Sequence, residues 1–152
     1  MKKIHIILAA CVAASFVIHA YAGFSGECAY IRENMLRLHV MANSDSEEDQ
    51  ALKLIVRDAI LNESGGFELT QSNLKLLEDV ARREVNADGK DYPVKAELVN
   101  MFFPTRHYGD ITVPAGRYDA VRLTIGSGDG ENWWCVMFPP MCIPAATGDK
   151  LP

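Results

Sequence analysis

The sequence predicts an α+β domain, a two-layer sandwich in which helices from the N-terminal half pack on a mainly antiparallel sheet. Two segments with helical periodicity, at about 47–62 and 71–86, follow one short strand in the first half of the domain. From residue 94 onwards apolar residues alternate with polar ones, which is the period of half-buried strands. Helices followed by consecutive strands are typical of the α+β class.

The first strand is expected at residues 36–41. Leu36, Leu38 and Val40 alternate there with polar or mixed neighbours. The strand should end at residues 42–46, whose side chains favour turns and helix caps because they bond nearby backbone N–H groups.

Acidic residues begin the first helix, where the helix dipole favours negative charge. Ser44 with Glu47, or Asp45 with Glu48, has the spacing of a capping box. Both helices carry an apolar stripe at helical spacing, which predicts the face that packs on the sheet. The stripes are Leu52, Ile55, Val56, Ala59 and Ile60 in the first helix and Leu74, Leu77 and Ala81 in the second.

Four strands are expected in the second half, at 94–103, 111–113, 118–125 and 133–138. The middle two should be joined through a tight turn at residues 114–116. The glycines of Gly126-x-Gly128-x-Gly130 would suit a phosphate loop only if a helix followed. The residues that follow are typical of a strand, so we interpret the glycine run as a hairpin connection.

The N-terminus has the pattern of a secretory signal peptide. Lys2 and Lys3 precede an apolar run, and Ala20-Tyr21-Ala22 provides a cleavage site after Ala22. An uncleaved anchor helix is the alternative, because the apolar stretch is nearly long enough to span a bilayer. The expected organisation is a signal peptide at 1–22, a mobile segment at 23–35, a single α+β domain at 36–143 and a short tail at 144–152.

Cleavage would leave 13 basic and 20 acidic residues, a net charge of −7. An acidic surface without clusters of Lys and Arg argues against nucleic acid or an anionic membrane as partner. Membrane contact is therefore expected only through the signal segment before cleavage.

Three cysteines would remain in the exported protein. Cys135 and Cys142 are predicted to form a disulfide, because the chain between them can fold back at Pro139-Pro140. Cys28 would then be free or paired between chains. The alternative is that all three are reduced and packed as small apolar residues.

The residues suggest neither a metal site nor a cofactor, and we expect no catalytic residues. The spacing of Cys135 and Cys142 is wider than that of usual structural zinc clips. His39 and His107 lie far apart in the sequence. The alternative function is a small exported thiol-dependent enzyme or hydrolase centred on Cys135, with one of these histidines as its base.

The segment 131–142, ENWWCVMFPPMC, is the candidate contact surface. Neighbouring tryptophans on a strand face opposite ways, so one could pack in the core while the other joins an exposed apolar patch. A surface for a protein partner and simple core packing both remain open here. The candidate partner-binding residues are Asn132, Trp133, Trp134, Phe138, Pro139 and Pro140, together with Asn43 and Asp45 in the turn after the first strand.

From about Ile31 to Cys142 the chain resembles the stage II sporulation protein R family. The motifs that carry the resemblance, in order, are Leu36 to Val40, Ala42 to Ser46, Asp49 to Lys53, Val56 to Ala59, Phe103-Pro104-Thr105, Tyr108-Gly109, Pro114-Ala115-Gly116 and the closing stretch from Gly126 to Cys142.

This resemblance implies a secreted signalling protein of endospore-forming bacteria and not an enzyme. Such a protein is made in the forespore and exported into the space between the forespore and mother-cell membranes. There it would activate a membrane-embedded aspartic protease, which processes the precursor of the early mother-cell sigma factor. On this reading the protease is the partner.

Overall fold

The computed structural model describes residues 2–63, 71–109 and 111–139. The chain divides into two compact units, residues 1–34 and 35–152. The bounds of the helices and strands are α1 Lys2–Glu33, β1 Leu36–Met41, α2 Glu47–Glu63, α3 Gln71–Ala87, β2 Val94–Phe103, β3 Arg106–Tyr108, β4 Ile111–Val113, β5 Gly116–Ile125 and β6 Asn132–Phe138.

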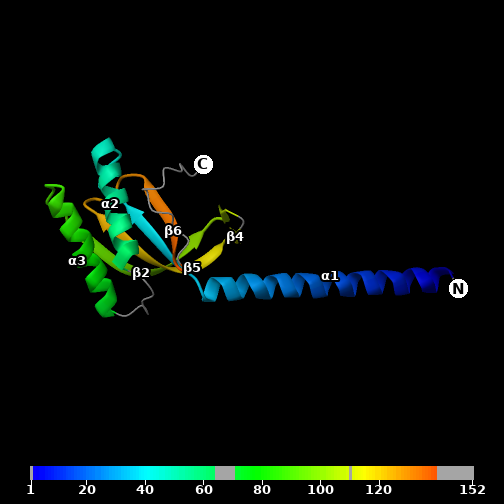
Figure 1. Ribbon diagram of the computed structural model, residues 1–152. Helices are drawn as coiled ribbons and strands as arrows, with labels where there is room; N and C mark the ends of the chain where they lie inside the picture. The colour runs from blue at the N-terminus through cyan, green and yellow to red at the C-terminus, as the bar shows by residue number, and fades with distance from the viewer. Residues whose placement is uncertain (1, 64–70, 110, 140–152) are drawn as a thin grey trace. The chain divides into compact units, whose positions relative to one another are not determined.

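The helix α1 makes up the described part of the N-terminal unit (Figure 1). It is long and apolar enough to cross a membrane, a property that signal sequences near the N-terminus share. The expected cleavage point after Ala22 lies inside this helix. The helix is compatible with a signal peptide, whereas its removal and the mobility expected of residues 23–35 stay predictions.

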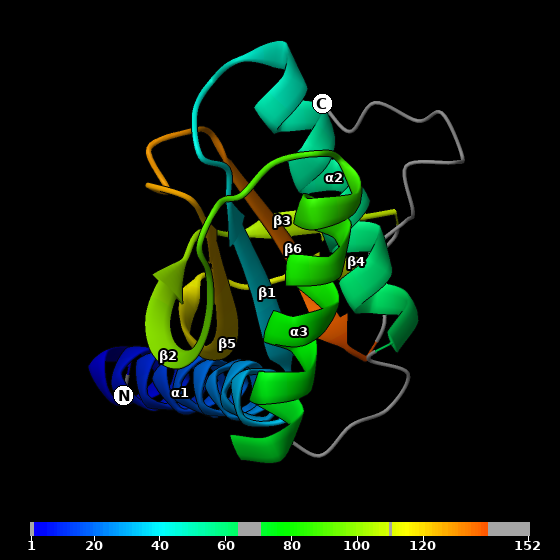
Figure 2. The same cartoon turned by 90° about the vertical axis from the view of Figure 1, so that its left-hand side faces the viewer.

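The described part of the second unit contains a four-stranded sheet in the order β2-β5-β1-β6 (Figure 1). β1 is parallel to β5 and antiparallel to β6, and β2 is antiparallel to β5. Helices α2 and α3 pack together on one face of this sheet, the face turned toward the viewer in Figure 2. The predicted α+β layout, with a mainly antiparallel sheet, is confirmed.

The hydrophobic core lies between this sheet and the two helices. Alternation along β1 turns Leu38 and Val40 into the core, as expected. The predicted helix stripes are largely buried; Ile55 is the exception, with 47% of its surface exposed. Burial of each large aliphatic side chain contributes about 1.5–3 kcal/mol relative to exposure. The helices contribute Leu52, Val56, Ile60, Leu74, Leu77, Val80, Ala81 and Val85 to this core.

A short hairpin of β3 and β4 lies on the opposite face of the sheet (Figure 2). The sequence did not predict β3, because Arg106–Tyr108 has no apolar alternation. The strand predicted at 111–113 is β4, which pairs with β3, while the next strand, β5, begins at Gly116 and pairs with β1 and β2.

The glycine-rich segment 126–130 connects β5 to β6, but the hairpin prediction is wrong because β1 lies between these strands. The segment crosses the end of β1 and bonds to the turn beyond it. The Gly130 amide donates to the Ala42 carbonyl at 3.0 Å, and the Ser127 amide donates to Asn43 Oδ1 at 3.1 Å. A Cβ on Gly130 would overlap the backbone carbonyl of Ser44, so the crossing requires glycine there.

Gly130→Ala should lower the free energy of unfolding by about 1–3 kcal/mol, because the backbone of the turn cannot make room without shifting. Urea unfolding followed by fluorescence measures this. Asp129→Ala is the matched control, because it places an alanine at the preceding position, where the side chain is exposed. Equal midpoints for the two variants would show that the crossing is not tightly packed.

Candidate functional site

Trp134 and His39 form a stacked pair on the far face of the sheet, away from α2 and α3. Their ring centroids lie 3.9 Å apart and their planes differ by 4°. Phe103, at the end of β2, meets the Trp134 ring edge-on with a centroid distance of 5.1 Å. His39 lies directly opposite Trp134 in the register of β1 and β6, and such cross-strand partners share one face of the sheet.

Arg37 is fully buried on the same far face. Its guanidinium lies over the Phe103 ring, 4.3 Å from the centroid. Nε donates to the Cys135 carbonyl at 3.1 Å, and Nη2 donates to the Tyr108 hydroxyl at 3.2 Å. Burial lowers the pKa of this guanidinium, but arginine remains charged in proteins. The far face therefore holds a buried positive charge whose described contacts are neutral groups.

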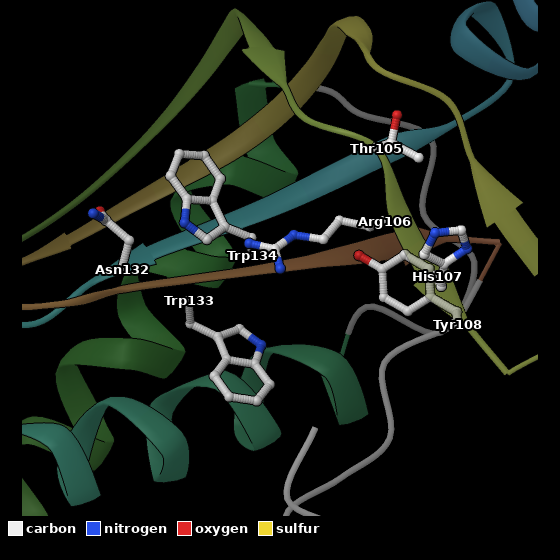
Figure 3. A pocket seen from close by; sticks show the side chains of 7 residues that line it. All are labelled: Thr105, Arg106, His107, Tyr108, Asn132, Trp133 and Trp134. Atoms are coloured by element: carbon white, nitrogen blue, oxygen red, sulfur yellow. The ribbon is translucent and has the colours of Figure 1, made fainter. Parts of the chain in front are cut away.

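A pocket of about 330 Å³ lies between the β3 hairpin and β6 (Figure 3). In Figure 3 the Arg106 side chain extends from β3 toward Trp134, and the side chains of Trp133 and Trp134 leave β6 in opposite directions. The lining residues are Thr105, Arg106, His107, Tyr108, Asn132, Trp133 and Trp134.

Trp133 packs on the helix side of β6. The Arg57 guanidinium of α2 lies 4.4 Å from its ring centroid, a cation–π contact. Arg57 is itself buried and forms an ion pair with Asp58 at 2.6 Å. Both tryptophans are half-buried, and of the two only Trp133 packs against the hydrophobic core. Their predicted part in partner binding stays a prediction.

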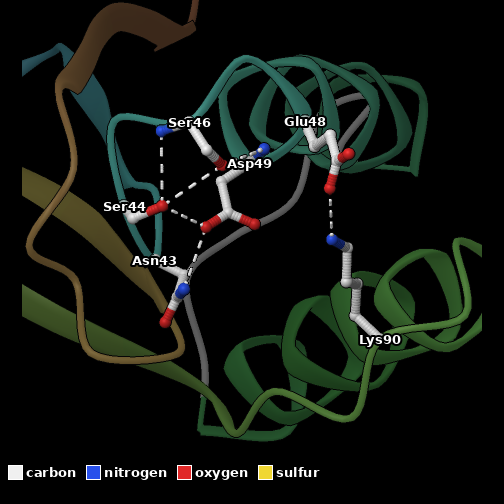
Figure 4. Close-up of polar contacts among 6 residues, drawn as sticks. All are labelled: Asn43, Ser44, Ser46, Glu48, Asp49 and Lys90. Atoms are coloured by element: carbon white, nitrogen blue, oxygen red, sulfur yellow. Dashed lines mark hydrogen bonds and ion pairs between the residues drawn. The ribbon is translucent and has the colours of Figure 1, made fainter.

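The turn after β1 holds the second group of candidate residues (Figure 4). Asn43 Nδ2 donates to Asp49 Oδ2 at 2.9 Å, and Ser44 Oγ donates to the same oxygen at 2.5 Å. Asp45 is exposed, and its Oδ1 accepts a hydrogen bond from the Glu131 amide at 2.6 Å. Asn43 thus connects the segment 126–130 to the start of α2, and Asp45 bonds the residue that follows this segment.

The predicted helix-capping pairs are wrong. Ser46 is the cap of α2, because its Oγ accepts a hydrogen bond from the Asp49 amide at 3.2 Å. Ser44 instead bonds the Asp49 carboxylate (Figure 4). These bonds hold the pKa of Asp49 below its usual range, with the Ser44 hydroxyl as the main cause.

The far end of β6 carries the other candidate residues. Phe138 is 49% exposed and Pro139 is exposed. Pro140 and Cys142 lie outside the described residues, so the predicted Cys135–Cys142 disulfide stays a prediction.

The geometry around Cys135 disfavours the thiol-enzyme alternative. The side chain is 2% exposed and belongs to the core under the helices. His39 faces the opposite side of the sheet, where it stacks on Trp134. His107 lies in the far-face hairpin and bonds Thr112. Neither histidine is placed to activate the thiol as a general base would. In the ranges that the structure describes, no cluster of three potential metal ligands occurs.

Sequence reasoning missed the hairpin wall of the pocket, residues 105–108. Their only signal was membership of the motifs Phe103-Pro104-Thr105 and Tyr108-Gly109. Residues 132–134, which the sequence predicts to bind a partner, line the same pocket, and their binding role stays a prediction. The spacing of residues in the sequence does not predict that residues 105–108 lie opposite residues 132–134, because β3 belongs to a separate two-stranded sheet and is not hydrogen-bonded to β6.

His39 makes stability depend on pH. Burial lowers its pKa below the ordinary 6.5, and Arg122 lowers it further, whereas the bond between Nε2 and Asn132 opposes the shift. As pH falls from about 7.5 to about 5.5, the unfolded chain binds a proton that the folded chain does not, so the free energy of unfolding decreases. Urea unfolding across this range should show the decrease in the wild type and a smaller one in His39→Gln. His107→Gln, which changes an exposed histidine, should follow the wild type, and equal slopes for all three proteins would contradict the assignment.

The model of the family "Stage II sporulation protein R" matches residues 32–147. Stage II sporulation protein R of Bacillus subtilis (strain 168) is 36% identical over 124 residues, which cover 74% of this chain and 55% of that protein. The chain thus spans about half the length of this relative. No solved structure matches the chain. The resemblance read from the motifs is confirmed, and the chain belongs to the stage II sporulation protein R family.

Proposed function

We propose that this chain is an exported sporulation signal that activates a membrane-embedded aspartic protease from the space between the forespore and mother-cell membranes. The activated protease processes the precursor of the early mother-cell sigma factor. The family match over residues 32–147 carries this proposal, because a sporulation role follows from the family. The apolar N-terminal helix supports export.

The proposed contact surface, called here the β6 surface, consists of Asn132, Trp133, Trp134, Phe138 and Pro139. The two tryptophans are held in place before any partner arrives, Trp134 by its stack on His39 and Trp133 by its contact with Arg57. Aromatic side chains that are already ordered lose little conformational entropy on binding, which favours them as anchors of protein contacts. The chain acts in this proposal as a ligand, and catalysis belongs to its partner.

Expression of the full chain should restore sigma-factor processing in a sporulating bacterium whose own family member has been deleted. The chain would be made in the forespore, and immunoblots would follow the precursor and its product. A variant lacking residues 2–22 is the control and should not restore processing, because it cannot be exported. Unprocessed precursor despite a folded, exported chain would refute the proposed function.

Phe138→Asp should reduce processing about tenfold, because it places a charge in the aromatic contact that we propose. Phe102→Asp is the matched control: Phe102 is 59% exposed on β2, at the opposite edge of the sheet, and should leave processing unchanged. Thermal unfolding would confirm that both variants fold. Equal processing by the two variants would place the contact away from the end of β6.

A further inference from the structure

The pocket beside β6 is positively charged on a chain that is acidic overall. The formal net charge is −5. Arg106 is exposed at the pocket, and Arg37 lies behind Tyr108; among the described residues neither has a carboxylate partner. Arg106 is close enough for its charge to lower the pKa of Arg37. Two guanidinium groups without a described carboxylate partner make this part of the surface attractive to an anion.

The walls of the pocket are preformed. Trp134 is held between the stacked His39 ring and the edge-on Phe103 ring. Tyr108 is fixed by the hydrogen bond that its hydroxyl accepts from Arg37. The volume of about 330 Å³ lies at the lower end of the range for ligand pockets and accommodates single side chains of a partner.

The polar groups at the rim are mainly donors. Asn132 Oδ1 is engaged by His39 Nε2 at 2.6 Å, which leaves the amide nitrogen of Asn132 available to donate. Arg106 adds the planar fork of a guanidinium, which matches the two oxygens of a carboxylate. A rim rich in donors fits a ligand whose polar atoms only accept hydrogen bonds, and an ionised carboxylate is such a group.

We propose that this pocket binds an Asp or Glu side chain of the protein partner, with its carboxylate paired to Arg106 and its methylene stem packed on Trp134. The partner is a protein because the pocket is continuous with the β6 surface, sharing Asn132, Trp133 and Trp134 with it. This inference rests on the proposed function and specifies one contact within it.

Two measurements test this inference. Sedimentation measures binding of the full chain to membrane vesicles that contain the protease, and immunoblots measure sigma-factor processing in cells. Arg106→Glu should weaken binding about tenfold and reduce processing, because it sets like charges against each other. Arg106→Lys should have a smaller effect, since it keeps the charge and loses the fork. Arg83→Glu makes the same charge change at an exposed position of α3, on the other face of the sheet, and should match the wild type.

Replacing acidic residues in the exposed segments of the protease by Lys, one at a time, should identify one change that restores binding to Arg106→Glu and weakens binding to the wild type. Thermal unfolding would verify that each variant of the chain folds.

The outcomes separate this inference from the function on which it rests. If the wild-type chain neither binds the vesicles nor activates the protease, the proposed function fails and the inference fails with it. If the wild type activates the protease and Arg106→Glu does so equally well, only the inference fails. Sodium acetate could quench the tryptophan fluorescence of the wild type and not that of Arg106→Glu. If Arg106→Glu nevertheless binds the protease as well as the wild type does, the pocket binds small carboxylates and a protein ligand is excluded.

Discussion

Burial of β1 on both of its faces is the constraint around which the second unit is arranged. Leu38 and Val40 need only apolar neighbours, which α2 and α3 provide. Arg37 and His39 need polar partners as well, because an unbonded polar group in the interior costs free energy. The Cys135 carbonyl, the Tyr108 hydroxyl and Asn132 supply them. Those partners come from β6 and β3, so satisfying the polar face of β1 also assembles the two walls of the pocket.

The parts of the fold that follow local periodicity could be predicted. The bounds of β1, α2, α3 and β2 lie within a residue or two of those expected, because an apolar stripe or an alternating run records which face is buried. Strand neighbours could not be predicted in the same way. The composition of the segment 126–130 indicates a turn, but composition does not reveal that β1 lies between the strands it joins. Pairings of this kind depend on contacts between residues distant in sequence.

In the candidate site, too, the residues with a distinctive local sequence pattern could be predicted, and those placed by contacts distant in sequence could not. Asn132, Trp133 and Trp134 stood out in the sequence because adjacent tryptophans beside prolines and cysteines are unusual. Arg106 did not stand out, because an exposed arginine in a short polar strand has no distinctive local pattern. Its position depends on a hairpin that folds across the sheet. The charge of the pocket could therefore be recognised only once the two walls were seen together.

The order of the strands has a consequence for passage through a membrane. β1 comes early in the chain, yet both of its neighbours in the sheet, β5 and β6, begin only at residues 116 and 132. A chain that is threaded N-terminus first cannot complete the central strand pairings until almost all of it has emerged. Contacts this distant in sequence form slowly. If the chain is exported as proposed, this topology would delay completion of the sheet until almost the whole chain has crossed the membrane.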